Sequence, residues 1–351
     1  SEINLRKRDI TNMRMALRTG AATYLVADID RGGVFASVYG SIALLPEEEK
    51  KLIKGIIINK FRGDISLFDE GRKILHELTG VPVVGVIPYF RDIYIEEEDS
   101  VSLESKNTRA GSDKINVAIV LLKRLSNFTD FSVLERDERF HTYYTNNVEE
   151  IGKADIIILP GTKNTIADLQ NIKANGIADA IIRAHKDGKK VIGICGGYQM
   201  LGARIEDPDR IEGETTSIPG LGILPLITVM EPEKVTRQSR FQFRNHPDTC
   251  RGYEIHMGKT TLLDGSTASS LNRLEDGRED GYLLNDKCWG SYLHGILDND
   301  VVLNELAEGL TQATPTTFNY TDFKNQQYDK LAEHVRACVD LQYIYSTLKT
   351  K

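Results

Sequence analysis

The chain has 351 residues, of which 40% are hydrophobic and 27% are charged, and its formal net charge at pH 7 is -7. This composition is typical of a globular protein with a sizeable core, and the length predicts two domains. An acidic chain without a block of Lys or Arg gives no electrostatic basis for binding nucleic acid, and no apolar run is long enough to span a membrane.

The four cysteines are far apart in the sequence and form no Cys-x-x-Cys pair. Zinc sites are built from such pairs, so the spacing predicts no metal centre. We find no signal peptide, and unpaired cysteines are typical of a reducing compartment. These observations predict a cytoplasmic protein without a bound metal.

The first 112 residues predict an α/β domain. After a loop and an amphipathic helix, strands and helices alternate along the chain. The predicted strands are 23–27, 55–58 and 83–87, and the predicted helices are 34–44 and 67–79. Alternation at this spacing predicts parallel strands joined by crossover helices. The acidic and polar segment 96–114 then predicts a linker, and we place the domain boundary near residue 112.

Residues 113–300 predict a second α/β domain. Its strands are INVAIVLL from Ile115, DIIILPG from Asp155 and the run from Val191 to Ile194, with a helix in ANGIADAIIRAHKDG. The strand-like segments that follow predict antiparallel additions to this core. Residues 301–351 predict a helical tail, interrupted by the turn TQATPTT.

The segment KVIGICGGYQMLG, residues 190–202, places Cys195 on a tight turn between a buried strand and a helix. Free amides in the first turn of a helix favour a thiolate and can also bind an oxyanion. Glycines at 193, 196 and 197 allow strained backbone angles and leave room for a substrate. The pattern predicts a nucleophilic cysteine; a buried structural cysteine is the alternative.

A cysteine nucleophile that attacks an amide needs a base, and His294 is the predicted one. It follows the strand CWGSYL and precedes Gly295, so the strand end can bring it to the sheet edge that carries Cys195. His256 is the rival, because it lies in the strand GYEIHMG on the same face as Glu254.

The pattern Gly-x-Cys-x-Gly-x-Gln around Cys195 resembles the nucleophile elbow of class I glutamine amidotransferases, which release ammonia from glutamine. The segment LPGTKNT also matches this class. The resemblance implies that the amides of Gly161 and Gly196 form the oxyanion hole and that Gln199 contacts glutamine.

The glutamate that follows the histidine by two residues in most of this class is replaced here by Ile296. This departure implies a Cys-His dyad whose ring is held by a backbone carbonyl or another carboxylate. A thiolate is nucleophilic by itself, so the orienting group matters less for Cys than for Ser. Among the class I glutamine amidotransferases, the absence of this glutamate makes the chain resemble the branch that amidates corrinoid precursors.

The blocks SEINLRKRDITNM, VADIDRGGVFAS, IINKFRGD, VIPY and EEEDS resemble cobyric acid synthases from Ser1 to about Asn299. The resemblance implies a partial P-loop domain, similar to dethiobiotin synthetase, followed by the amidotransferase domain. It also implies glutamine and corrinoid substrates, with ATP and Mg used by the complete enzyme to activate a carboxylate. A cobyrinic acid a,c-diamide synthase and a non-catalytic amidotransferase-like subunit are the alternatives.

The sequence contains no Gly-x-x-x-x-Gly-Lys-[Ser/Thr] motif, although the family carries one near its N-terminus. We therefore interpret the chain as a fragment and expect it not to bind ATP productively by itself. Asn59, at a strand end, resembles a base-reading position, while Asp28, Asp30 and Arg31 follow another strand end and are candidates for contacts to phosphates, metal or substrate. A homo-oligomer is one way to cover the exposed edge of such a sheet.

Overall fold

The computed structural model describes residues 3–96, 106–111, 113–310 and 318–348. Two predicted segments fall wholly or mainly outside this part of the chain. Residues 97–105 and 112 of the predicted linker are not among the described residues, and neither is the predicted turn at 311–317.

The chain forms two compact units, residues 1–95 with 324–351 and residues 96–323. These units differ from the predicted division near residue 112 and from a separate tail after residue 300. Val339 forms an antiparallel bridge with Gly85, and the hydroxyl of Tyr343 donates to the carbonyl of Lys54 at 2.8 Å. These contacts join residues that are far apart in sequence, so no local pattern could have predicted them.

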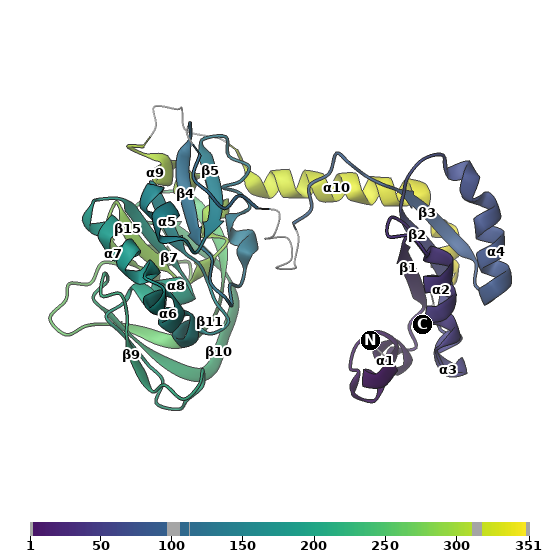
Figure 1. Ribbon diagram of the computed structural model, residues 1–351, viewed down its shortest axis with the longest axis horizontal. Coiled ribbons are helices and arrows are strands. Elements are labelled where there is room, and N and C mark those ends of the chain that lie inside the picture. The colour runs from purple at the N-terminus through teal and green to yellow at the C-terminus, as the bar shows by residue number, and fades with distance from the viewer. Residues whose placement is uncertain (1–2, 97–105, 112, 311–317, 349–351) are drawn as a thin grey trace. The chain divides into compact units, whose positions relative to one another are not determined.

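The first unit contains a parallel three-stranded sheet in the order β1-β2-β3, which confirms the predicted alternation (Figure 1). The strands are β1 (Thr23–Asp28), β2 (Ile53–Phe61) and β3 (Val83–Pro88). The helices are α1 (Asn12–Thr19), α2 (Val34–Ala43), α3 (Glu47–Lys50), α4 (Asp69–Thr79) and α11 (Leu341–Ser346), and α10 (Tyr320–Cys338) begins in the second unit and continues in the first. The 3-10 helices are η1 (Ile3–Arg8) and η2 (Ile65–Phe68).

The core of the first unit lies between its sheet and the two helices α2 and α4. Ile56 and Ile58 of β2 are fully buried, as is Leu75 of α4, and Val38 of α2 packs in the same cluster. Gly33, at φ +67°, precedes α2 and turns the chain from the strand end into this helix. The carboxyl ends of β1 and β2 therefore lie at one edge of the sheet, where α2 begins.

The second unit is built on a six-stranded sheet in the order β14-β15-β7-β6-β4-β5. Its strands are β4 (Ile115–Val120), β5 (Phe140–Thr145), β6 (Ile156–Leu159), β7 (Lys190–Ile194), β14 (Tyr282–Asn285) and β15 (Cys288–Ser291). All neighbours pair in parallel except β14 and β15. Every residue of β6 and β7 is buried, as expected of a parallel sheet covered on both faces.

Helices cover this sheet and carry two well-formed N-caps. They are α5 (Val148–Lys153), α6 (Thr165–Ala174), α7 (Ile177–Lys186), α8 (Gly196–Leu201) and α9 (Asp300–Ala307), with the 3-10 helices η4 (Phe128–Phe131) and η5 (Ile296–Asp298). Asn147 caps α5, and the side chain of Asn164 accepts from the amide of Ala167 at the start of α6.

The same unit also contains a second, seven-stranded sheet, which includes the antiparallel strands that the sequence predicts. Its strands are β8 (Arg204–Glu206), β9 (Ser217–Pro219), β10 (Leu226–Phe243), β11 (Thr249–Leu262), β12 (Asn272–Leu274), β13 (Glu279–Asp280) and β16 (Leu293–His294). The long hairpin of β10 and β11 is its main feature (Figure 1). The pairing of Tyr253 with His294 attaches β16 to this hairpin.

No helix in the described ranges has both the length and the apolarity that a membrane span requires.

Candidate active site

Cys195 lies between β7 and α8, on the turn that the sequence predicts. Its backbone has φ +52°, a region that side chains other than glycine rarely adopt, and such strain is characteristic of functional sites. A Cβ at Gly197 would lie 2.0 Å from the carbonyl oxygen of Leu159, so only glycine lets α8 approach β6 this closely. The tight turn thus has a packing reason as well as a chemical one.

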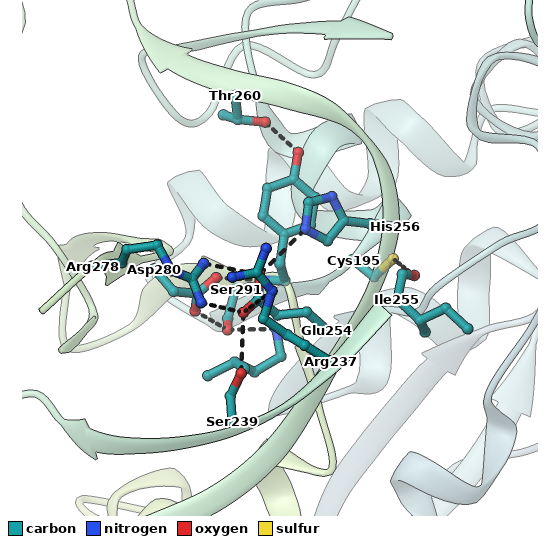
Figure 2. Close-up of polar contacts among 12 residues, drawn as sticks. Cys195, Arg237, Ser239, Glu254, Ile255, His256, Thr260, Arg278, Asp280 and Ser291 are labelled. Carbon is teal, nitrogen blue, oxygen red and sulfur yellow. Dashed lines mark hydrogen bonds and ion pairs between the residues drawn. The ribbon is translucent and has the colours of Figure 1, made fainter. Parts of the chain in front are cut away.

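The thiol of Cys195 lies beside the hairpin strand β11. Its Sγ is 3.6 Å from the carbonyl oxygen of Ile255, and the residue is 7% exposed (Figure 2). The amide of Cys195 donates to the carbonyl of Ser291 at the end of β15. The predicted nucleophile is therefore fixed between the two sheets of the unit.

His294 is fully buried and is held by a carboxylate that the sequence did not identify. Its Nδ1 lies 2.6 Å from Oδ2 of Asp130, and the amide of Gly295 donates to Oδ1 of the same side chain at 2.9 Å. The side-chain nitrogen of Asn127 lies 3.1 Å from Nε2. Asp130 therefore fixes both the ring and the backbone that follows it.

The electrostatics of His294 favour its protonated form. Burial by itself lowers the pKa of this imidazole, but the charge and hydrogen bond of Asp130, together with the adjacent Cys195, raise the pKa to about 10. A histidine with this pKa carries a proton near neutral pH and can donate it to a leaving group.

Ile296 stands where a glutamate would orient the histidine in most class I amidotransferases, and it is 1% exposed. Its side chain is packed in the core, while Asp130 reaches His294 from η4. The sequence left either a backbone carbonyl or another carboxylate to hold the ring of His294. In the described structure this group is a carboxylate, that of Asp130.

Gly161 lies against the side chains of both Cys195 and His294, the two predicted catalytic residues. A Cβ there would be 3.0 Å from Cε1 of His294 and 3.6 Å from the Cβ of Cys195. A Cβ at Gly196 would lie 2.7 Å from the side chain of Thr162, which follows Gly161. The two glycines predicted for the oxyanion hole are therefore brought to the same place, and their role stays a prediction.

Gln199 lies in the cavity beside Cys195, but its amide group already has partners. Its Nε2 donates to the carbonyl of Met257 at 2.9 Å and to the hydroxyl of Tyr292 at 3.2 Å, and its Oε1 accepts from Thr165 at 3.0 Å. These bonds link α8, α6 and the hairpin. Contact between Gln199 and glutamine stays a prediction, and the bonds give the side chain a structural role as well.

His256, the rival base, belongs to a different cluster on β11. Its ring stacks on Tyr292 at 3.7 Å between centroids, and Nε2 lies 3.6 Å from Glu254 (Figure 2). Burial raises the pKa of the Glu254 carboxyl, but the nearby His256 and the hydrogen bonds from Arg278 and Ser239 outweigh it, so this pKa falls to about 2. Glu254 thus also forms ion pairs with Arg237 and Arg278, whereas the carboxylate of Asp130 contacts His294 directly.

We expect His294→Ala to lower the rate of glutamine hydrolysis by about 10²- to 10⁴-fold, the usual contribution of a general acid and base. His256→Ala should lower kcat less than tenfold, because its ring packs on Tyr292 and faces Glu254. Steady-state ammonia release from the two variants provides the measurement. A loss in His256→Ala as large as that in His294→Ala would transfer the role of base to His256.

A cavity of about 330 Å³ opens beside Cys195. This volume is at the lower end of the range for small-molecule sites, about 300–1,000 Å³. The charged or titratable side chains on its walls are Lys163, Cys195, Glu212, Lys234 and His256. The site is thus suited to a compact ligand that carries both signs of charge.

Glu212 is the acidic side chain of this cavity, and no pattern in the sequence predicts it. Burial raises the pKa of its carboxyl, which accepts a hydrogen bond from the amide of Ile166 at 2.8 Å. The loop that carries it is held by the fully buried Asp207, which accepts from the amides of Ile211 and Glu212 at 2.8 Å each.

The four residues predicted for nucleotide or substrate contacts lie in the first unit, at the carboxyl ends of β1 and β2. Asp28 accepts from Nζ of Lys60 at 2.9 Å, and Arg31 lies 3.8 Å from Asp28 with its side chain 87% exposed. The side chain of Asn59 accepts from the amide of Lys60. The structure therefore brings the residues to one edge of the sheet, as the strand order predicts.

Asp30 at the same edge is paired with Arg62, which donates to it at 2.5 and 3.1 Å and stacks over the ring of Tyr89 at 3.7 Å. Hydrogen bonds from Lys60 and Arg62 lower the pKa values of Asp28 and Asp30, respectively. Among the residues that the structure describes, no three His, Cys, Asp or Glu side chains are grouped for a metal ion.

Comparison with known proteins finds a family match for the amidotransferase-like unit and another for most of the first unit. A CobB/CobQ-like glutamine amidotransferase domain matches residues 116–302, and an AAA domain matches residues 5–96. Cobyric acid synthase of Parabacteroides distasonis is 67% identical over 99% of this chain and 71% of its own length. The chain belongs to the cobyric acid synthase family.

Other members of the cobyric acid synthase family are nearly as similar. That of Bacteroides fragilis is 60% identical over 99% of this chain and 70% of its own length. A solved structure, PurLQS from Thermotoga maritima, covers 57% of this chain and all of its own at 19% identity, with a TM-score of 0.43. The AAA domain match and the named relatives indicate ATP use in this family, and the expectation that this chain by itself does not bind ATP productively stays a prediction.

In this cobyric acid synthase family member, sequence reasoning missed Asp130 and Glu212. Asp130 precedes His294 by 164 positions, and no spacing rule connects the two residues. Glu212 lies in a loop between β8 and β9, where an acidic residue is normally a solvated surface group. The segment NFTDF, which contains Asp130, and the loop that contains Glu212 have no sequence pattern that points to a site. Only their contacts in the folded chain, with His294 and with the start of α6, suggest a role.

Proposed function

We propose that this chain is the glutaminase-bearing part of the enzyme for the glutamine-dependent amidation of side-chain carboxylates of adenosylcobyrinic acid a,c-diamide, which gives cobyric acid. The observation that carries the proposal is the arrangement of Cys195, His294 and Asp130 in a member of this family. The block DIDRGGVFAS favours this reaction over that of the related diamide synthase.

In the proposed glutaminase step, the Cys195 thiolate attacks the carboxamide carbon of glutamine, and the new C–S bond leaves the oxygen as an oxyanion. The amides of Gly161 and Gly196 are proposed to bind this oxygen. His294 then gives its proton to the departing nitrogen, and the C–N bond breaks to release ammonia. Water then attacks the thioester while His294 accepts its proton, and the C–S bond breaks. This step releases glutamate and restores the Cys195 thiolate and the protonated His294.

The cavity supports an amino acid as the ligand of this step. We propose that Glu212 faces the α-ammonium group of glutamine, because a partly buried carboxylate gains a partner for its charge when a cation binds. Gln199 is proposed to shape the cavity by tying α8 to β11. A corrinoid is far larger than a cavity of about 330 Å³, so its carboxylates are not proposed to react here.

The amidation step of the family uses ATP, and we propose that the first unit contributes to it together with Mg. The described residues do not fit a Mg site by themselves, because Asp28 and Asp30 are already paired with Lys60 and Arg62. We therefore assign no residue to the metal. A cytoplasmic location is proposed, supported by four free cysteines.

The experiment that tests the proposal is ammonia release from glutamine by the purified chain. We expect one ammonia and one glutamate per glutamine, because the thioester intermediate is hydrolysed. A non-catalytic subunit, the alternative of a different class, would release no ammonia and would not react with a glutamine-like electrophile at Cys195.

A further inference from the structure

An irregularity in the β10–β11 hairpin brings a lysine to the cavity of Cys195. Val229 pairs with Lys259 and Lys234 pairs with Met257, so five positions on β10 match two on β11. The three extra residues form a bulge. Opposite it, Gly258 has φ +89°, and a Cβ there would lie 3.0 Å from the carbonyl of Val229. The bulge therefore depends on a glycine at this position.

The bulge changes which residue faces the cavity, because side chains alternate between the two faces of a strand. In an unbroken ladder the partner of Met257 would be Glu231, two positions after Val229. The odd number of inserted residues instead places Lys234 opposite Met257, and both residues line the cavity. A cation thus stands where regular pairing would have put a carboxylate. Bulges that re-aim a side chain are common beside active sites.

Lys234 has no competing partner within the part of the chain that the structure describes. It forms no ion pair and no side-chain hydrogen bond there, although Glu254 on the neighbouring strand is bound by Arg278 and Arg237. Its side chain is exposed at the cavity. The ammonium group is therefore available for an anionic ligand.

Lys163, the other lysine of the cavity, comes from a different part of the chain. It lies between β6 and α6, three residues before Ile166, whose amide donates to the carboxylate of Glu212. Lys163 and Glu212 are therefore both attached to the start of α6. Lys234 comes from the hairpin, as do His256 and Met257. A zwitterion with its ammonium group at Glu212 would have its carboxylate free to face the hairpin.

From this arrangement we infer that Lys234 is a specificity-determining residue that binds the α-carboxylate of glutamine. The inference rests on the proposed glutaminase function of the same site. A desolvated carboxylate needs a countercharge, and a charged hydrogen bond supplies it. Lys234 selects a free amino acid over carboxamides that lack the α-carboxylate, and it takes no part in bond breaking.

The test compares two reagents that modify Cys195 in the full chain. The diazo-oxo analogue of glutamine carries the α-carboxylate, and iodoacetamide does not. In Lys234→Ala, the second-order rate constant for the analogue should fall about 10- to 100-fold, the scale of one charged hydrogen bond. The rate constant for iodoacetamide should not change. Lys234→Arg should keep most of the reactivity with the analogue.

Lys259→Ala is the matched control, because Lys259 is an exposed lysine of the same hairpin and does not line the cavity. It should react like the wild-type chain with both reagents. For glutamine itself, Lys234→Ala should raise KM and leave kcat nearly unchanged, as expected when binding to substrate and transition state is lost equally.

Three results would overturn the inference. Unchanged labelling of Lys234→Ala by the analogue would show that Lys234 makes no such contact, especially if Lys163→Ala were slowed instead. An equal loss with both reagents would show that Lys234 acts on the thiol or the fold. If the wild-type chain reacted with iodoacetamide and ignored the analogue, the proposed glutaminase function would itself fail.

Discussion

Cys195→Ala is expected to abolish ammonia release from glutamine, with a loss of about 10³-fold or more. Removing the nucleophile of a catalytic unit leaves only the contributions of binding and the oxyanion hole. The side chain is small and lies on a turn, so an alanine at 195 should preserve the fold. In the complete enzyme, amidation supported by free ammonia should continue, because that step does not use the thiol.

The measurement is ammonia release from glutamine, with Cys338→Ala as the matched control because Cys338 lies in the first unit. Labelling with the diazo-oxo analogue should be confined to Cys195. Burial raises the pKa of Cys250 to about 11 and that of Cys288 to about 12, so neither forms a thiolate near neutral pH. Ammonia release that survives in Cys195→Ala would show that the nucleophile lies elsewhere.

Asp130→Asn is expected to lower glutamine hydrolysis by about 10- to 10³-fold. The carboxylate holds Nδ1 of His294 at 2.6 Å, and an asparagine cannot supply the negative charge that stabilises the imidazolium. Replacing the orienting aspartate of a serine triad costs about 10⁴-fold, and a thiolate depends less on this group. The loss should therefore be large but smaller than that of Cys195→Ala.

The pH dependence gives Asp130→Asn a signature of its own. The pKa of His294 is raised to about 10 in the wild-type site, so the imidazolium that protonates the departing nitrogen persists up to that pH. Without the charge of Asp130, burial remains and lowers the pKa. The alkaline limb of kcat/KM should therefore move to lower pH in the variant.

Asp137→Asn is the control, since Asp137 is also buried but is bound to Arg139 at 2.6 Å. The alkaline limb of kcat/KM in this variant should stay at the wild-type pH, even if the variant is less stable. An unchanged limb in Asp130→Asn would mean that another group holds the ring of His294.

Local patterns were sufficient to predict a nucleophile and to predict most elements of the fold. The apolar strand, the Gly-Gly turn and the helix start identified the position of Cys195 because all three lie within thirteen residues. Predicted strands such as 23–27 and 83–87 are present as β1 and β3, since hydrophobic periodicity is itself local. The family could be predicted for the same reason, because the segments that resemble cobyric acid synthases are each contiguous in the sequence.

Contacts between distant residues were not accessible in this way. Asp130 reaches His294 across 164 positions, and the C-terminal residues Val339 and Tyr343 join the first unit through Gly85 and Lys54. The bulge that aims Lys234 is set by the pairing of β10 with β11 and by no property of β10 alone. Sequence by itself thus determined the α/β class and the family of this protein, and it predicted Cys195 as the reactive thiol. The tertiary structure decided which carboxylate holds His294 and which charges line the cavity, because electrostatic partners depend on distance in space and not on separation along the chain.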